Sequence, residues 1–186
     1  ARLRRELLIL DEAVVAHPRL TWLRAWRGNV LLQSGDAARA LPDLERAARR
    51  LERSGLVRAW LGQALRAQGR LDHAEAELQA ATRLEPRLWS SFQGLAEIRV
   101  LRGEYALALE AISRATELAP TTVSPLLLKS ELEQSLGMTE QALCDVEKAL
   151  RLHSSYREAH VLKARILLDA GRAELAAAAA QKAIEL

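Results

Sequence analysis

The chain has 186 residues, of which 49% are hydrophobic, 27% are charged and only 4% are aromatic, and its formal net charge is +3. Abundant Ala, Leu, Arg and Glu favour helices, and the shortage of aromatic residues argues against an all-β or doubly wound α/β fold. The apolar content excludes a disordered chain, and no uncharged apolar run reaches the roughly 18 residues that span a bilayer. We therefore expect a soluble, all-α protein.

Glycine recurs at a fixed interval along the chain. Five of the nine glycines are separated by 34 residues each, and alanines follow each of the five after five and after twelve places. Such a period predicts a repeated pair of helices, because a glycine with positive φ commonly ends a helix. The five glycines are Gly35, Gly69, Gly103, Gly137 and Gly171.

The glycine phase divides the chain into consecutive units with two amphipathic helices each. We expect eleven helices, with second helices that end near Pro18, Pro86 and Pro120, because proline cannot continue a helix. Pro42 falls inside a predicted second helix and requires a kink or a late start there. The predicted units form a single array: a second helix of a preceding partial repeat at 1–20, then repeats at 21–54, 55–88, 89–122, 123–156 and, truncated, 157–186.

This pattern resembles the tetratricopeptide repeat, with small residues at the eighth place of each unit, Gly at the fifteenth, and Ala at the twentieth and twenty-seventh. The resemblance implies an all-α, right-handed solenoid of helix-turn-helix repeats. The large apolar places match less well. Leu occurs at the seventh place only as Leu61 and Leu95. Large apolar residues occur at the sixth place instead, among them Trp26 and Trp60.

In this family the first helix of each repeat lines a concave groove that binds partners. Exposed aromatic side chains beside amides and charged groups would anchor a peptide or helix there. Trp22, Trp26 and Trp60 have a second interpretation, as core residues that replace the missing apolar groups. The groove residues implied by the resemblance are Trp22, Trp26, Asn29, Trp60, Gln63, Arg66, Gln93, Glu97, Leu128, Glu131, Leu162 and Arg165.

One known use of the family is a clamp of Lys and Asn residues that grips the terminal carboxylate of a chaperone tail. Only Asn29 matches that clamp in this chain. Its other places hold Ala25, Trp60, Ser90 and Gly94, none of which supplies the required charge or amide. The sequence therefore predicts no chaperone-tail clamp.

No arrangement of residues in the sequence indicates catalysis, a cofactor or a metal. The four histidines form no metal-binding pair, no phosphate-binding glycine loop is present, and Cys144 has no residue placed to activate it. The strongest candidate for nucleic acid or an anionic surface is a basic run, which we interpret mainly as a solvated helix end. The run comprises Arg46, Arg49, Arg50 and Arg53.

We therefore expect a non-catalytic scaffold that binds a peptide or helix of a partner protein, with no membrane insertion. The alternative is an accessory arm of a larger enzyme or envelope machine, resembling the repeat arms of glycosyltransferases or polysaccharide exporters. The single cysteine fits the cytoplasm and leaves the periplasm open. The excess of Arg over Lys indicates a bacterial source, and the uncapped apolar ends would allow further repeats or self-association.

Overall fold

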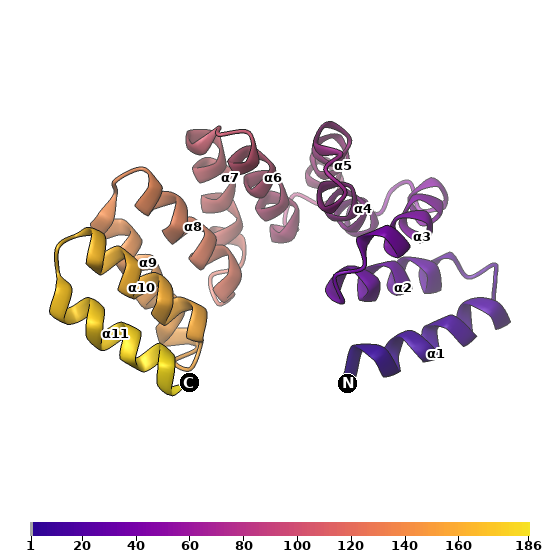
Figure 1. Ribbon diagram of the computed structural model, residues 1–186. Coiled ribbons are helices and arrows are strands. Elements are labelled where there is room, and N and C mark those ends of the chain that lie inside the picture. The colour runs from indigo at the N-terminus through magenta and orange to yellow at the C-terminus, as the bar shows by residue number, and fades with distance from the viewer. Residues whose placement is uncertain (1) are drawn as a thin grey trace. The chain divides into compact units, whose positions relative to one another are not determined.

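The computed structural model describes residues 2–186; residue 1 of the predicted partial repeat lies outside the described residues. The described chain contains eleven α-helices and no strand (Figure 1). The predicted fold class and number of helices are thereby confirmed. The helices are α1 (Arg2–Ala16), α2 (Thr21–Gln33), α3 (Ala37–Arg50), α4 (Gly55–Ala67), α5 (Leu71–Leu84), α6 (Trp89–Leu101), α7 (Tyr105–Leu118), α8 (Val123–Ser135), α9 (Thr139–Leu152), α10 (Arg157–Asp169) and α11 (Ala173–Glu185).

The chain forms two compact units. The N-terminal unit ends at Ile98 and holds α1 to α5 with most of α6, and the C-terminal unit runs from Arg99 to Leu186 and holds α7 to α11. Within the N-terminal unit α2 packs on α3 and α4 on α5, and within the C-terminal unit α8 packs on α9 and α10 on α11. The even-numbered helices from α2 to α10 begin 34 residues apart. The division into repeats at these points stays a prediction.

Each glycine of the repeated set ends a first helix in the left-handed conformation, with φ between 73° and 84°. The same pair of backbone hydrogen bonds closes every one of these ends. At the first, Gly35 N donates to Leu32 O over 2.9 Å and Asp36 N donates to Leu31 O over 2.9 Å. This is the Schellman arrangement, which satisfies carbonyls that the helix leaves unpaired. The predicted role of these glycines is confirmed.

Prolines mark the ends of several second helices but do not delay the start of another. Helices α1, α5 and α7 each end two residues before Pro18, Pro86 and Pro120, as predicted. Pro42 is the sixth residue of α3, which begins at Ala37 and continues to Arg50, so the late start is wrong. Pro42 is exposed and lies only two turns into the helix. Its ring therefore removes one hydrogen bond there without meeting packed neighbours.

Small residues bring the two helices of a repeat close together. A Cβ atom added to Gly62 in α4 would lie 2.6 Å from Leu78 Cγ and 3.1 Å from the carbonyl oxygen of Ala74, both in α5. At the same repeat place in α8, Ser130 Oγ donates to the carbonyl oxygen of Ala142 over 2.7 Å. The first and second helices therefore meet at the small residues that the sequence indicated, with the alanines buried between them.

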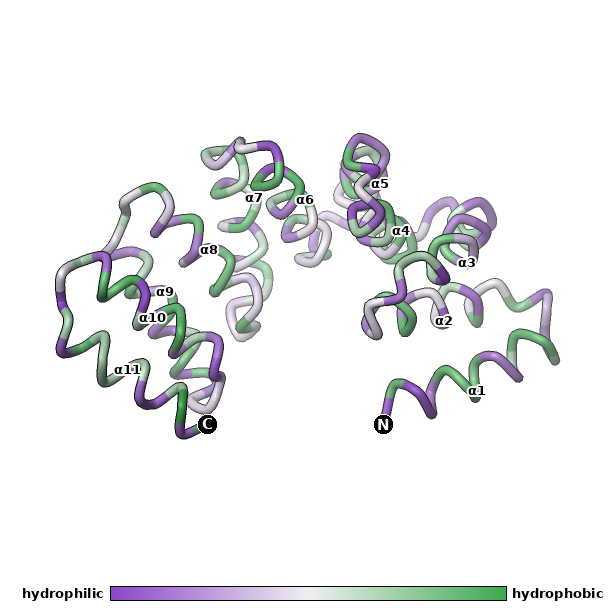
Figure 2. Tube along the Cα trace, viewed as in Figure 1, coloured by the Kyte–Doolittle hydropathy of each residue, from purple (hydrophilic) through white to green (hydrophobic). Residues whose placement is uncertain are grey.

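Within residues 2–186, no helix is long and apolar enough to cross a membrane. Figure 2 shows hydrophobic and hydrophilic residues alternating along the helices, as amphipathic helices require.

Candidate interaction surface

Two exposed tryptophans lie on one face of α2 in the N-terminal unit. Trp22 is 48% exposed and Trp26 is 52% exposed, and their spacing of four residues places them on the same side of the helix. A different side of the helix holds the buried residues Ala25 and Gly28, and at Gly28 the side chain of Leu44 in α3 approaches closely. About half of each tryptophan is exposed, so the interpretation of Trp22 and Trp26 as core residues is wrong.

The Trp26 ring is held in position from α1. Its Nε1 donates a hydrogen bond of 2.9 Å to Glu6 Oε1. This bond meets the only polar group of the indole, so the exposed part of the ring offers apolar area to a ligand. Asn29, one turn further along α2, is half-buried on the same face.

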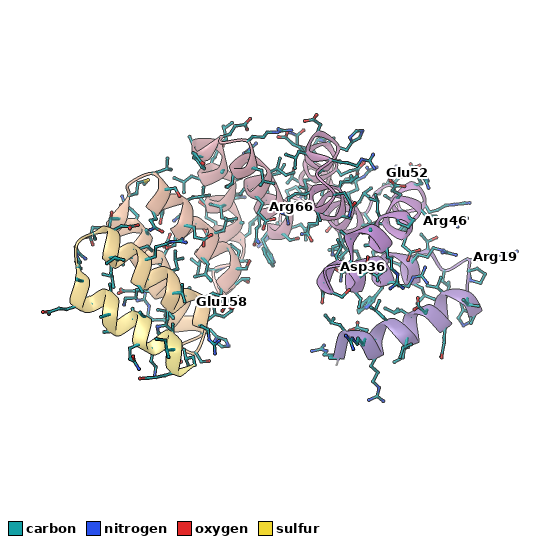
Figure 3. The ribbon with its side chains drawn as sticks, viewed as in Figure 1. Arg19, Asp36, Arg46, Glu52, Arg66 and Glu158 are labelled. Carbon is teal, nitrogen blue, oxygen red and sulfur yellow. The ribbon has the colours of Figure 1, made fainter. Side chains whose placement is uncertain are left out.

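The neighbouring first helix α4 contacts α2 and presents a more covered surface. Trp60 and Gln63 are both half-buried on this helix. The burial of Trp60 therefore does not decide between a groove residue and a core residue. Arg66, labelled in Figure 3, forms an ion pair of 2.9 Å from Nη2 to Glu97 Oε2 in α6. Gln93 Nε2 donates to Glu97 Oε1 over 2.8 Å. Three of the predicted polar residues therefore bind one another.

A second polar set connects the first helices α8 and α10 in the C-terminal unit. The exposed Arg165 places Nη2 at 3.5 Å from Glu131 Oε1 and donates from Nε to Gln134 Oε1 over 3.1 Å. Gln134 also donates to Asp169. Leu128 is half-buried in α8. The predicted charged residues of this unit are thus adjacent and accessible.

Leu162 does not belong to the surface, contrary to the prediction. It is only 4% exposed and belongs to the apolar core of the C-terminal unit, together with Ala159 and Ile166. These residues form the buried stripe of α10, at intervals of three and four. Val161 is 53% exposed instead. The prediction for Leu162 is wrong, because α10 turns its sixth place toward the core.

A buried aspartate in the N-terminal unit was missed by the sequence analysis. Asp43 in α3 is 5% exposed and accepts hydrogen bonds from Arg27 Nε over 2.6 Å and Arg27 Nη2 over 3.0 Å. Arg24 Nη1 lies 3.5 Å from the same carboxylate. Arg27 occupies the seventh place of its repeat, where the family has Leu. A basic residue there, with an acid 16 residues later, was the available signal.

A buried aspartate bound to a basic residue at the seventh place occurs again three repeats later, in the C-terminal unit. Asp145 in α9 is 2% exposed and accepts hydrogen bonds of 2.6 Å from Lys129 Nζ and of 2.6 Å from Lys148 Nζ. Lys129 also lies 3.3 Å from Glu133 Oε1. The four side chains form a charged cluster between α8 and α9, which replaces part of the apolar packing of a typical repeat.

The surroundings shift the pKa values of the two carboxyl groups of this cluster in opposite directions. Burial disfavours the charged form of Asp145, but hydrogen bonds from Lys129 and Lys148 outweigh it and lower the pKa of Asp145. Burial raises the pKa of Glu133, and the attraction of Lys129 offsets this only in part. Glu133 Oε2 is buried and accepts no hydrogen bond within the described chain. Glu133 is therefore the strained member of the cluster.

We expect Glu133→Gln to raise the free energy of unfolding at pH 7 by up to about 1 kcal/mol, because a neutral amide costs less to bury than a carboxylate. A carboxyl with a raised folded pKa loses stability as the pH rises through its unfolded pKa of about 4.3. The gain should therefore disappear below that pH. Urea denaturation at pH 7 and pH 4 measures both values. A loss of stability at pH 7 would show that the contact with Lys129 outweighs burial.

Within residues 2–186, no three His, Cys, Asp or Glu side chains come together as a metal site would require. Cys144 is an exposed free thiol on α9. The groups that the structure does bring together are apolar rings on α2 and paired charges on the other first helices. Such groups suit non-covalent binding of another molecule.

Comparison with family models matches two stretches of the chain, residues 31–97 and 127–186, and both models describe the tetratricopeptide repeat. Together the stretches cover more than half of the sequence, in the two units separately. The chain belongs to the tetratricopeptide repeat family. A search of curated protein sequences found no match.

Solved structures of other tetratricopeptide repeat proteins share the fold. TTC0263 of Thermus thermophilus is 24% identical over 90% of this chain and 91% of its own, with a TM-score of 0.79. YrrB, described as having an unusual peptide-binding site, is 18% identical over 95% and 91%, with a TM-score of 0.67. MamA from Desulfovibrio magneticus RS-1 is 19% identical over 89% and 94%, with a TM-score of 0.74.

Proposed function

We propose that this tetratricopeptide repeat chain is a non-catalytic scaffold that binds a peptide or helix of a partner protein on the faces of its first helices. The observation that carries the proposal is the pair of half-exposed rings, Trp22 and Trp26, on one side of α2. Family membership supports it, since these repeats typically serve as binding scaffolds. The cytoplasm would keep the exposed thiol of Cys144 reduced.

Rigid aromatic rings are effective anchors for a partner. A tryptophan offers a large apolar area and loses little side-chain entropy on binding, and such anchors commonly contribute about 2 kcal/mol or more each. The hydrogen bond from Trp26 to Glu6 fixes one ring before any ligand arrives. The amide of Asn29 on the same face would fix the register of the ligand.

The double variant Trp22→Ala/Trp26→Ala should lose the partner while remaining folded. We expect at least tenfold weaker binding, and each substitution should lower the free energy of unfolding by less than the about 3–5 kcal/mol that a core tryptophan costs. The partner is captured from cells with the wild-type chain, and its affinity for both chains is then measured by titration. Urea denaturation measures the stability.

The matched control is Tyr105→Ala, which removes an exposed aromatic ring from the start of the second helix α7. Partner affinity should be unchanged in this variant. Equal loss of affinity in Tyr105→Ala and in the tryptophan double variant would contradict a specific anchor on α2. A loss of stability on the core scale would contradict the surface role of the rings.

A further inference from the structure

Four arginines line one pocket of the N-terminal unit. The pocket has a volume of about 410 Å³ and is lined by two residues of the turn after α1 (Pro18 and Arg19), by Thr21 and Arg24 of α2, and by Arg46 and Arg50 of α3. No acidic residue belongs to this lining. Figure 3 shows Arg19 and Arg46 along the same edge of the unit. Three separate elements therefore direct positive charge into one space.

The positive charge of the pocket is only partly balanced. Arg24 lies 3.5 Å from Asp43, whose carboxylate already binds Arg27 at 2.6 Å. In the described part of the chain, Arg19, Arg46 and Arg50 have no carboxylate partner at ion-pair distance. Arg46 and Arg50 are also one helical turn apart, a spacing at which like charges repel. Arg19, Arg46 and Arg50 therefore keep guanidinium donors that no carboxylate of the described chain occupies.

The surroundings of the pocket limit the size of an anion that binds there. Arg50 also lines two adjacent pockets: one contains Arg46, Arg49 and Glu45, and the other contains Arg53 and Trp22 with Glu52 and Glu85. The carboxylates, above all Glu52 and Glu85, interrupt the positive charge that a longer polyanion such as a nucleic acid strand would follow. The pocket itself is lined by four arginines and Thr21 and by no carboxylate, so a single anionic group fits it better than a long one does.

We propose that this pocket, which we call the arginine pocket, binds one dianionic phosphate group. Guanidinium groups donate paired hydrogen bonds to phosphate oxygens, and two negative charges match several arginines better than a single carboxylate does. Resting on the proposed function, the phosphate belongs to a phosphorylated side chain of the partner segment. Arg50 links the arginine pocket to the pocket that Trp22 lines, so one segment reaches both.

The repeat provides a matched control for the arginine variants. Arg83 lies in the last turn of α5 and is exposed, at the place that Arg49 occupies in α3 one repeat earlier. The place of Arg50 is taken in α5 by Leu84, so the arginine pocket has no counterpart there. Arg83→Gln therefore removes the same charge from the same kind of helix end without touching the arginine pocket.

The test is isothermal titration calorimetry at fixed ionic strength with three probes: inorganic phosphate, a Gly-phosphoserine-Gly tripeptide and the unphosphorylated Gly-Ser-Gly. The wild-type chain should bind one phosphate per chain, and the phosphoserine tripeptide should bind more tightly than inorganic phosphate. Arg50→Gln and Arg19→Gln should each weaken binding at least tenfold, and Arg83→Gln should leave it unchanged. Circular dichroism confirms that each variant is folded; the substituted arginines are exposed.

The pH dependence identifies the charge state that binds. Phosphoserine loses its second negative charge near pH 6, so tripeptide binding should weaken at pH 5, whereas sulfate, which stays dianionic, should bind equally at both values. Loss of tripeptide and sulfate binding together would overturn the dianion as the ligand.

Other outcomes would also overturn the proposal. Absence of saturable binding, or equal weakening in Arg83→Gln, would exclude the arginine pocket. Binding of inorganic phosphate without tighter binding of the phosphoserine tripeptide would exclude a phosphorylated protein segment as the source.

An oligonucleotide of ten thymidines that binds more tightly than the tripeptide would assign the surface to nucleic acid. The probes are too short to need the tryptophans, so Trp22→Ala/Trp26→Ala should bind them normally even if the proposed partner surface fails.

Discussion

Replacing Leu78 with Ala should lower the free energy of unfolding by about 3–5 kcal/mol. The Leu78 side chain is fully buried in α5 and fills the space left by two glycines of the N-terminal unit. A Cβ atom at Gly62 would lie 2.6 Å from Leu78 Cγ, and one at Gly94 would lie 2.9 Å from Leu78 Cδ2. Truncation therefore opens a cavity between three helices that cannot readily close. Urea denaturation of the variant measures the loss.

Two further variants separate packing from helix propensity. Leu84→Ala, on the exposed side of the same helix, should cost less than about 1 kcal/mol. Gly62→Ala should destabilise the wild-type chain by overpacking against Leu78, but it should be tolerated or stabilising in the Leu78→Ala background, where its methyl group enters the cavity. Additive effects of Gly62→Ala and Leu78→Ala would show that the two residues do not share this space.

Asp145→Ala should lower the free energy of unfolding at pH 7 by about 2–4 kcal/mol. Removal of the buried carboxylate leaves Lys129 half-buried, with only Glu133 to balance its charge. The matched control is Glu147→Ala, which removes a more exposed partner, 2.7 Å from Lys163, on the same helix. That change should cost less than about 1 kcal/mol, as surface ion pairs do. Equal losses in the two variants would contradict a special role for burial.

The effect of Asp145→Ala should also depend on pH in one direction. The pKa of Asp145 is lowered in the folded chain, so its stabilising contribution is complete above the unfolded pKa of about 3.9 and is lost as the pH falls through the folded value. Urea denaturation should therefore give a constant difference between wild type and variant from pH 5 to pH 8, and a smaller one below pH 4. A difference that shrinks between pH 5 and pH 8 would assign the effect to another group.

The helices and their turns could be predicted from the sequence because they depend on local chemistry. A glycine with positive φ and the alanines at fixed distances from it act within a single repeat, so their phase alone located Gly35 and its four equivalents. The exposure of Trp22 and Trp26 was left open between groove and core by the sequence, and the structure decides it by exposing both rings.

The remaining surface depended on how each helix is turned by its neighbours. Leu162 and Trp26 occupy the same place of the repeat, yet one is buried and the other is half-exposed. Helix α10 buries Ala159 and Leu162 in its first two turns, whereas α2 buries Ala25 and Gly28 there, so the two helices are rotated differently about their axes. The rotation of a helix about its axis depends on the side chains of the helices that pack against it. The spacing of residues within one helix therefore does not predict it.

The charged pairs were hidden for a different reason. Arg27 and Lys129 stand at the seventh place, where the family has Leu. Considered within one helix alone, such a charged residue indicates only a loss of apolar packing. Their partners Asp43 and Asp145 lie on the next helix, and only packing of the two helices brings the charges to 2.6 Å. A mismatch in an apolar position is thus best interpreted together with the facing helix.

The contacts between helices have a consequence for folding. Within each unit, the helix pairs in substantial contact are adjacent or next but one along the chain. Short sequence separations favour rapid folding, and contacts limited to neighbouring helices allow one helix pair to open without disturbing helices further along the chain. Opening can therefore proceed in steps, one helix pair at a time. A segment bound across several first helices would join these steps into one cooperative transition, so that binding would also suppress local unfolding.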